Sequence, residues 1–225
     1  MPTAGQANFG VIVAAGRGRR FGGLKQFARV KNKPLLFYSL RAFERCPVMK
    51  GYVVVANPGK ICAVRRMGRI FRLKKLRAVV KGGRERMDSV AAGLAALPEE
   101  GYVAVHDAAR PLIVPAMLAR GFRIVRQSGA VAFGARVTET VKEVVGRRIV
   151  RTVDREGLVT IQTPQFFDLR LLRRAYARCR NQGVLVTDEC QAVELWGVEP
   201  VVIVHERLNL KVTYPEDLLV CEALL

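Results

Sequence analysis

Short apolar runs rich in β-branched residues alternate along the chain with segments whose apolar residues recur at helical spacing. This alternation is typical of repeated βα units, which build a mostly parallel sheet flanked by helices, so the predicted fold class is α/β. The predicted strands cover Phe9–Ala14, Tyr52–Ala56, Leu76–Val80, Tyr102–His106, Val131–Ala135 and Val198–Val204. The predicted helices cover Pro34–Arg45, Lys60–Arg72, Met87–Leu97, Pro115–Gln127, Asp168–Arg180, Asp188–Trp196 and Pro215–Leu224.

The alternation breaks between residues 137 and 162. Two apolar segments there, 141–145 and 149–153, flank Gly146 and Arg147, which predicts a two-stranded arm outside the main sheet. Two strands cannot bury themselves alone. We find no repeat, low-complexity tract or linker, so residues 1–225 are predicted to form a single domain with an arm at about 137–162.

The charge balance is strongly basic, with 38 Lys and Arg against 19 Asp and Glu and a formal net charge of +19. A field of this sign attracts phosphate polyanions, so a nucleotide and a nucleic acid both stay open as partners. The densest basic cluster predicts a solvated helix face, on which Arg65, Arg69 and Arg72 would lie together.

Several classes of protein are excluded by composition. The five cysteines stand far apart with no CxxC pair, which argues against a zinc ribbon or a thioredoxin-like site. No apolar stretch reaches the roughly 18–20 residues of a membrane span, and the first residues lack an apolar signal segment. We therefore expect a soluble, cytoplasmic protein.

The first predicted strand leads into a glycine-rich loop, residues 15–25, that carries three arginines and ends at Lys25. Small residues let backbone N–H groups approach phosphate oxygens, and the cations add charge, so the loop predicts a phosphate site. It is not the loop of a P-loop NTPase, because Gln26 follows Lys25. The dinucleotide-binding fingerprint also fails, because Phe21 stands at its third glycine.

Two further loops follow predicted strands. In Gly82–Ser89 the glycines admit a flat base, and Asp88 or Ser89 would cap the next helix. Asp107 directly follows the fourth predicted strand, at the edge where open α/β sheets bind ligands, which makes it a candidate metal or substrate contact.

The ordered motifs AAGRGRR, KQF, GGRERMDSV, VHDAARP, VDREGL, QTPQFF, TDE and NLKVTYPED resemble those of the methylerythritol phosphate cytidylyltransferase family across nearly the whole chain. The sequence departs from the family pattern at Leu24, where a proline is usual. The resemblance implies a Rossmann-like sheet with a protruding arm used for dimerisation. It also implies the monofunctional form, with no second catalytic domain after Leu225.

The resemblance also implies the site residues. It puts the cytidine against Ala14, Ala15, Gly16, Gly82 and Ser89, and makes Arg20, Lys25 and Lys211 the catalytic contacts to the triphosphate. It surrounds the acceptor with Asp107, Arg110, Thr138, Thr140, Arg155, Thr163 and Thr187, with Arg155 supplied by a partner's arm. Asp107 would also bind Mg²⁺ or another divalent cation.

The implied reaction joins a small polyol phosphate to CTP in a homodimer, with no specific nucleic acid and no membrane as partner. A ribitol 5-phosphate cytidylyltransferase of the same superfamily is the nearest alternative, since it differs only in the acceptor. A basic nucleic-acid-binding module is the alternative of another class, and net charge is its sole support.

Overall fold

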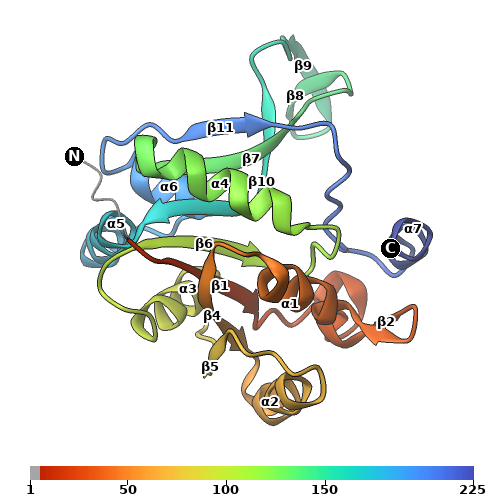
Figure 1. Cartoon of the computed structure of the whole chain (residues 1–225). Helices are drawn as coiled ribbons and strands as arrows, with labels where there is room; N and C mark the ends of the chain where they lie inside the picture. Colours follow the sequence, from red (N-terminus) through yellow and green to blue (C-terminus); the bar gives the residue numbers. More distant parts are fainter. Residues whose placement is uncertain (1–5) are drawn as a thin grey trace.

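A seven-stranded sheet forms the centre of the molecule (Figure 1) in the computed structural model, which describes residues 6–225. Its strand order is β11-β7-β10-β6-β1-β4-β5. Taken along the chain, these strands are β1 (Asn8–Ala14), β4 (Met49–Ala56), β5 (Leu76–Lys81), β6 (Tyr102–Asp107), β7 (Ala130–Arg136), β10 (Val159–Asp168) and β11 (Val201–Val204). The six predicted strands are all present, although β11 begins three residues later than expected.

The sheet is mostly parallel, as predicted, because only β10 runs against its neighbours. It pairs antiparallel with both β6 and β7, whereas the other pairings are parallel. β10 is missing from the predicted strands because residues 159–162 fall within the predicted arm, and only the second half of the strand is fully buried. Since β10 is reversed, its amino-terminal half lies at the edge where the parallel strands end.

Residues 6–225 form seven α-helices, close to the predicted positions, and six of them flank the sheet. The seven helices are α1 (Leu35–Arg45), α2 (Ile61–Ile70), α3 (Arg86–Ala95), α4 (Pro115–Ser128), α5 (Leu169–Asn181), α6 (Glu189–Glu194) and α7 (Asp217–Leu224). The prediction that Arg65, Arg69 and Arg72 share one helix face is wrong for Arg72. Helix α2 ends at Ile70, and Arg72 has a positive φ of 52°. Within residues 6–225, no helix has the length and apolar character to cross a bilayer.

The helices form one layer on each face of the sheet. Helices α1, α2 and α4 pack on one face through side chains such as Leu40, Val64 and Phe122. Helices α3, α5 and α6 cover the other face, where Val90 and Leu172 are buried. Both faces of the central strands are therefore apolar, as expected of strands buried on two sides.

A smaller cluster attaches the end of the chain to this body. Helix α7 contributes Cys221, which packs with Val30, Leu35 and Val212 beside a short hairpin of β2 (Arg29–Val30) and β3 (Lys33–Pro34). This packing brings the segment before α7 next to the loop that follows β1.

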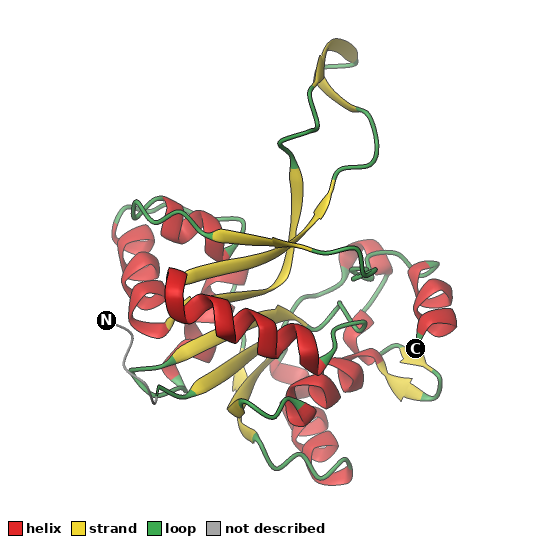
Figure 2. Ribbon diagram, turned by 45° about the horizontal axis from the view of Figure 1, so that its top comes forward, coloured by secondary structure: helices red, strands yellow, loops and turns green. Residues whose placement is uncertain are grey.

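The predicted arm is a hairpin of β8 (Val141–Val145) and β9 (Arg148–Val153) that projects well beyond the body (Figure 2). Its apolar side chains Val144, Val145, Ile149 and Val150 are each more than half exposed. The predicted boundary is wrong by four residues, because 159–162 belong to β10 and pair with β7. The projecting segment is therefore 137–158.

Candidate active site at the carboxyl edge of the sheet

Asp107, the last residue of β6, lies at the centre of the polar side chains at this edge. Its Oδ1 accepts hydrogen bonds from Arg86 (3.3 Å from Nε and 3.1 Å from Nη2), and its Oδ2 lies 2.6 Å from Lys211 Nζ. Burial alone would raise the pKa of this carboxyl, but the two cations hold the pKa well below its usual range. Asp107 is therefore a fixed negative charge.

The three predicted catalytic cations converge beside Asp107. Lys25 Nζ donates to the carbonyl oxygen of Val212 at 2.6 Å, next to Lys211 in the chain. The pKa of Lys25 is lowered, first by burial and then by the nearby Lys211 ammonium. The Arg20 guanidinium lies 6.0 Å from the ring centroid of Tyr214, on the same segment. The edge is thus a compact site of positive charge.

The path of the glycine-rich loop, which has Leu24 in place of the usual proline, is set by Gly18 and Gln26. Gly18 has a φ of 63°, and a Cβ there would lie 1.9 Å from the carbonyl oxygen of Gly23, so only glycine fits. The buried Gln26 amide donates to the carbonyl oxygens of Ala14 (2.7 Å) and Gly16 (3.0 Å). These contacts fix the path of the loop and bring Lys25 to the site.

Predicted nucleoside contacts from two loops also come together. A Cβ on Gly82 would lie 2.3 Å from Ala15 Cβ and 3.1 Å from Ser89 Oγ, so the glycine lets the loops after β1 and β5 touch. Ser89 Oγ accepts from the backbone N–H of Gly83 and donates to the carbonyl oxygen of Glu85. The two loops form a small-residue surface suited to a flat base.

The predicted cap of α3 needs correction. Glu85 is the N-cap, and its backbone N–H donates to Asp88 Oδ2 at 3.2 Å, while the Glu85 side chain accepts from the Asp88 backbone N–H. Ser89 lies one turn inside the helix and does not cap it. The reciprocal pair is a capping box, in which two orphan backbone donors are satisfied at once.

A buried hydrogen-bond chain positions Thr163 and Arg110. Thr163 Oγ1 accepts from the Asp107 backbone N–H at 3.0 Å and lies 3.3 Å from His106 Nδ1. Burial lowers the pKa of His106 to about 4, so its ring is neutral near pH 7. Arg110 Nη1 donates to the carbonyl oxygen of Asn209, whose side chain donates to that of Thr163. The start of β10 and the segment after β11 are thereby joined.

The remaining predicted contacts are not gathered around Asp107. Thr138, Thr140 and Arg155 lie at the base of the arm, where the Arg155 guanidinium donates to the carbonyl oxygen of Thr138. Within residues 6–225, no hydrogen bond links these three to Asp107. Thr187, before α6, donates from its backbone and hydroxyl to the Gln191 side chain.

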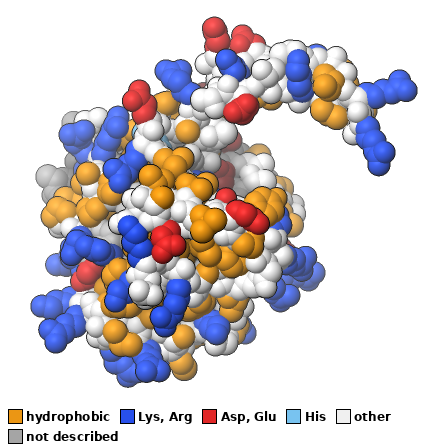
Figure 3. Space-filling view, turned by 90° about the vertical axis from the view of Figure 1, so that its right-hand side faces the viewer, with side chains coloured by type: hydrophobic (Ala, Val, Ile, Leu, Met, Phe, Trp, Pro, Cys, Tyr) orange, Lys and Arg blue, Asp and Glu red, His pale blue; other side chains and the backbone are white. Residues whose placement is uncertain are grey.

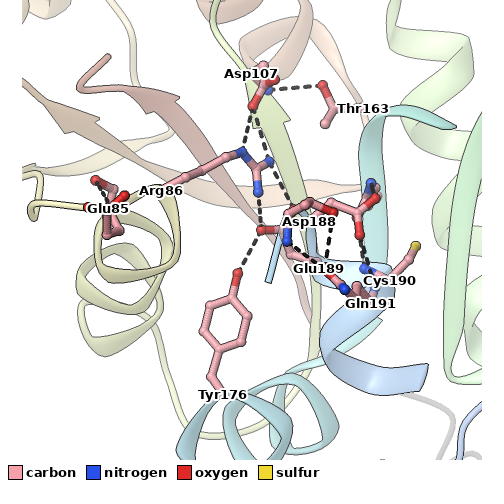
Figure 4. Close-up of polar contacts among 12 residues, drawn as sticks. Glu85, Arg86, Asp107, Thr163, Tyr176, Asp188, Glu189, Cys190 and Gln191 are labelled. Atoms are coloured by element: carbon pink, nitrogen blue, oxygen red, sulfur yellow. Dashed lines mark hydrogen bonds and ion pairs between the residues drawn. The ribbon is translucent and has the colours of Figure 1, made fainter. Parts of the chain in front are cut away.

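Sequence reasoning missed a buried network behind Asp107 (Figure 4). Arg86 pairs with Glu189 at the start of α6, and Tyr176 of α5 donates to the same carboxylate at 2.7 Å. Arg86 and Glu189 both lie in motifs that were recognised, but neither received a role. Their separation of 103 residues left no local signal for the pairing.

Asp107 is the residue that the sequence predicts to bind a divalent cation. No group of three or more His, Cys, Asp or Glu side chains with metal-binding geometry occurs in the described part of the chain. Mg²⁺ usually takes one or two carboxylates together with phosphate oxygens and water. The ionised Asp107 fits such a shared site, provided that the half-exposed Lys211 side chain moves off Oδ2.

The sequence as a whole matches one protein family. The family model for IspD, 2-C-methyl-D-erythritol 4-phosphate cytidylyltransferase, covers residues 9–225. A relative with that name from Halalkalibacterium halodurans is 37% identical over 217 residues, or 96% of this chain and 95% of the relative. Another from Caldicellulosiruptor bescii is 40% identical, covering 95% of each chain.

Solved structures agree with the sequence match. The 2-C-methyl-D-erythritol 4-phosphate cytidylyltransferase from Thermus thermophilus superposes with a TM-score of 0.78 at 33% identity, over 95% of this chain and 97% of that one. The Francisella tularensis enzyme gives 0.82 at 27% identity, over 97% and 100%. With motifs, fold and site in agreement, this chain belongs to the 2-C-methyl-D-erythritol 4-phosphate cytidylyltransferase family.

Proposed function

We propose that this chain transfers the cytidylyl group of CTP to 2-C-methyl-D-erythritol 4-phosphate. The products would be 4-diphosphocytidyl-2-C-methyl-D-erythritol and pyrophosphate, in the non-mevalonate route to isoprenoid precursors. The observation that carries the proposal is the convergence of Arg20, Lys25 and Lys211 beside the small-residue surface around Gly82. Family membership supplies the identity of the two substrates.

The reaction needs alignment and positive charge more than it needs a base. A phosphate oxygen of the acceptor forms a bond to the α-phosphorus of CTP, while the bond from that phosphorus to the bridging oxygen breaks and pyrophosphate leaves with its electron pair. The nucleophile is ionised near pH 7, because the second pKa of a phosphate monoester is about 6. No proton has to be removed.

The cations at the carboxyl edge suit this chemistry. Lys25 and Lys211 would hold the α-phosphate region and stabilise the charge that develops there, and Arg20 would hold the departing phosphates. Ala14, Ala15, Gly16, Gly82 and Ser89 would contact the cytidine. Lys25 donates to the Val212 carbonyl oxygen and Lys211 pairs with Asp107, so both ammonium groups already lie at this edge before the nucleotide binds.

A divalent cation, most simply Mg²⁺, would bind between Asp107 and the triphosphate. When bound, it would neutralise negative charge on the phosphate oxygens. The chain would contribute the carboxylate of Asp107, whose geometry is set from the opposite side by Arg86.

The acceptor would bind on the side of the site that includes Arg110 and Thr163. Arg110 Nε and Asn209 Oδ1 are buried and have no hydrogen-bond partner in the described part of the chain. Such atoms are costly to leave unpaired. A phosphate oxygen of the acceptor could accept from Arg110 Nε, and a hydroxyl of the acceptor could donate to Asn209 Oδ1. Asp107, Thr138, Thr140, Arg155 and Thr187 would complete the acceptor site.

Arg155 would enter this site from a second copy of the chain. It lies on the projecting arm, whose exposed apolar side chains Val144, Val145, Ile149 and Val150 favour pairing with a symmetry mate. We therefore propose a homodimer with composite active sites.

A cytoplasmic location is also a proposal, and it is supported by five free cysteines, since disulfides persist mainly in oxidising compartments.

Removing either lysine should abolish most turnover. Lys25→Ala and Lys211→Ala should each lower kcat about 10²–10³-fold, the range for deleting one preorganised contact to transition-state charge. The measurement is pyrophosphate release at saturating CTP and acceptor. Lys50→Ala is the matched control, because Lys50 is exposed near the amino end of β4, at the opposite edge of the sheet. A folded Lys25 or Lys211 variant that keeps more than a tenth of wild-type kcat would contradict the role.

The acceptor should be selected strongly. With CTP and Mg²⁺, kcat/KM for 2-C-methyl-D-erythritol 4-phosphate should exceed that for ribitol 5-phosphate at least about 100-fold, or roughly 2.7 kcal/mol of transition-state stabilisation. The measurement is pyrophosphate release, carried out across a panel of polyol phosphates and with each of the four nucleoside triphosphates. Equal or better turnover of ribitol 5-phosphate would assign the chain to the alternative transferase. Salt-sensitive nucleic-acid binding without any turnover would favour the basic module.

Mixed dimers should reveal the shared site. Co-refolding Arg155→Ala chains with Lys25→Ala chains should restore about a quarter of wild-type activity, because half the dimers would be mixed and one of their two sites would be intact. Lys25→Ala mixed with Lys211→Ala is the control, since both changes lie in one body and no site is repaired. If mixed dimers form and Arg155→Ala gives no recovery, Arg155 does not act across the dimer.

A further inference from the structure

Arg86 occupies an unusual position for an arginine beside a triphosphate site. Its guanidinium lies between two carboxylates, Asp107 of β6 and Glu189 of α6 (Figure 4). Nε and Nη2 donate to Asp107 Oδ1, while Nη1 and Nη2 donate to Oε1 and Oε2 of Glu189. All three nitrogens donate to protein carboxylates, so the positive charge of this guanidinium is already paired within the protein.

The far side of the network is closed by a buried phenol. The Glu189 side chain is fully buried, and its Oε1 accepts both Arg86 Nη1 and the hydroxyl of Tyr176. Burial, followed by the Glu189 charge, raises the pKa of Tyr176 well above its usual value, so the phenol stays a donor near pH 7. A buried carboxylate held by an arginine and a phenol has little freedom to move.

The near side of the network faces the reacting groups. Asp107 Oδ1 is occupied by Arg86, so its other oxygen, Oδ2, is the one presented to Lys211 at 2.6 Å. The chain of contacts therefore runs from Tyr176 through Glu189, Arg86 and Asp107 to Lys211. Glu189 is the first residue of α6, two residues after Thr187, and Arg86 is the first residue of α3. The same guanidinium therefore connects the start of α6 to the start of α3.

We propose that Arg86, held by Glu189 and Tyr176, is a positioning residue for the transfer reaction. It fixes the Asp107 carboxylate so that Oδ2 faces Lys211 and the triphosphate, and it holds the start of α6 in place. It touches neither substrate. The inference rests on the proposed function, because turnover is one of the quantities that it predicts.

Arg86→Lys is the direct test, because lysine keeps the charge but cannot reach both carboxylates with a planar fork. We expect kcat to fall about 10–100-fold, the usual cost of losing a group that orients an active-site ligand, while the KM for CTP changes less than about threefold. Tyr176→Phe, which removes one hydroxyl, should give a smaller loss in the same direction. Arg170→Lys is the matched control, since Arg170 pairs with Glu100 on the surface, and it should keep wild-type kcat.

A double-mutant cycle separates positioning from general support of the fold. If Arg86 acts through Asp107, then Arg86→Lys should cost less than about threefold in kcat once Asp107→Asn is present, because residues that act as one unit are not additive. Equal fold losses in the two backgrounds would overturn the proposal. So would wild-type kcat in a folded Arg86→Lys variant.

A second readout needs neither substrate nor metal. Amide hydrogen exchange over residues 186–194 should quicken in Arg86→Lys and in Glu189→Gln, while exchange in β4 stays unchanged. Unchanged exchange over 186–194 would contradict the hold on α6. Turnover by the wild-type and Arg170→Lys proteins tests the proposed function by itself. An inactive wild type would refute that function. If both proteins are active, the result for Arg86→Lys tests the positioning role alone.

Discussion

The site depends on one buried constraint, the Asp107 carboxylate held between Arg86 and Lys211. An ionised carboxylate at the end of a buried strand is costly unless it is paired. Here one oxygen faces a guanidinium that is itself fixed by Glu189, and the other faces a lysine that is partly exposed. The pairing of Asp107 with Arg86 is therefore rigid, whereas the pairing of Asp107 with Lys211 can be exchanged. A ligand that replaces Lys211 on Oδ2 would meet a carboxylate already oriented.

The fold brings distant segments to this carboxylate by ending its strands at one edge. Loops after β1 and β5 supply the glycine-rich surfaces, β6 supplies Asp107, and the reversed β10 brings Thr163 to the same edge. The segment after β11 returns along it, because Val212 and Cys221 pack beside Leu35. Lys and Arg side chains are scattered over the face shown in Figure 3, so the net charge alone does not locate the site.

Local sequence patterns predicted most of the fold, because strands buried on both faces and amphipathic helices have distinct periods. They failed for β10, whose first four residues fall within the predicted arm, and for the hairpin of β2 and β3, which is only two residues per strand. Asp107 and Lys25 could be predicted from their places after strands. The pairing of Arg86 with Glu189 could not, because it depends on how α3 and α6 meet in space. The place of Arg155 in an active site could not be predicted from local patterns either, because the proposed arrangement requires a second copy of the chain.

We propose that this edge binds both the base and the triphosphate of CTP. Measuring nucleotide binding tests that proposal most directly. Melting temperatures should be compared for the four nucleoside triphosphates at equal concentration with Mg²⁺. A ligand at about 100 times its Kd stabilises the native state by about 2.7 kcal/mol, or roughly 5–10 °C for a chain of this size. CTP should give the largest shift, and Lys25→Ala should reduce it. Equal shifts with CTP and ATP would contradict binding of the cytosine base at this edge.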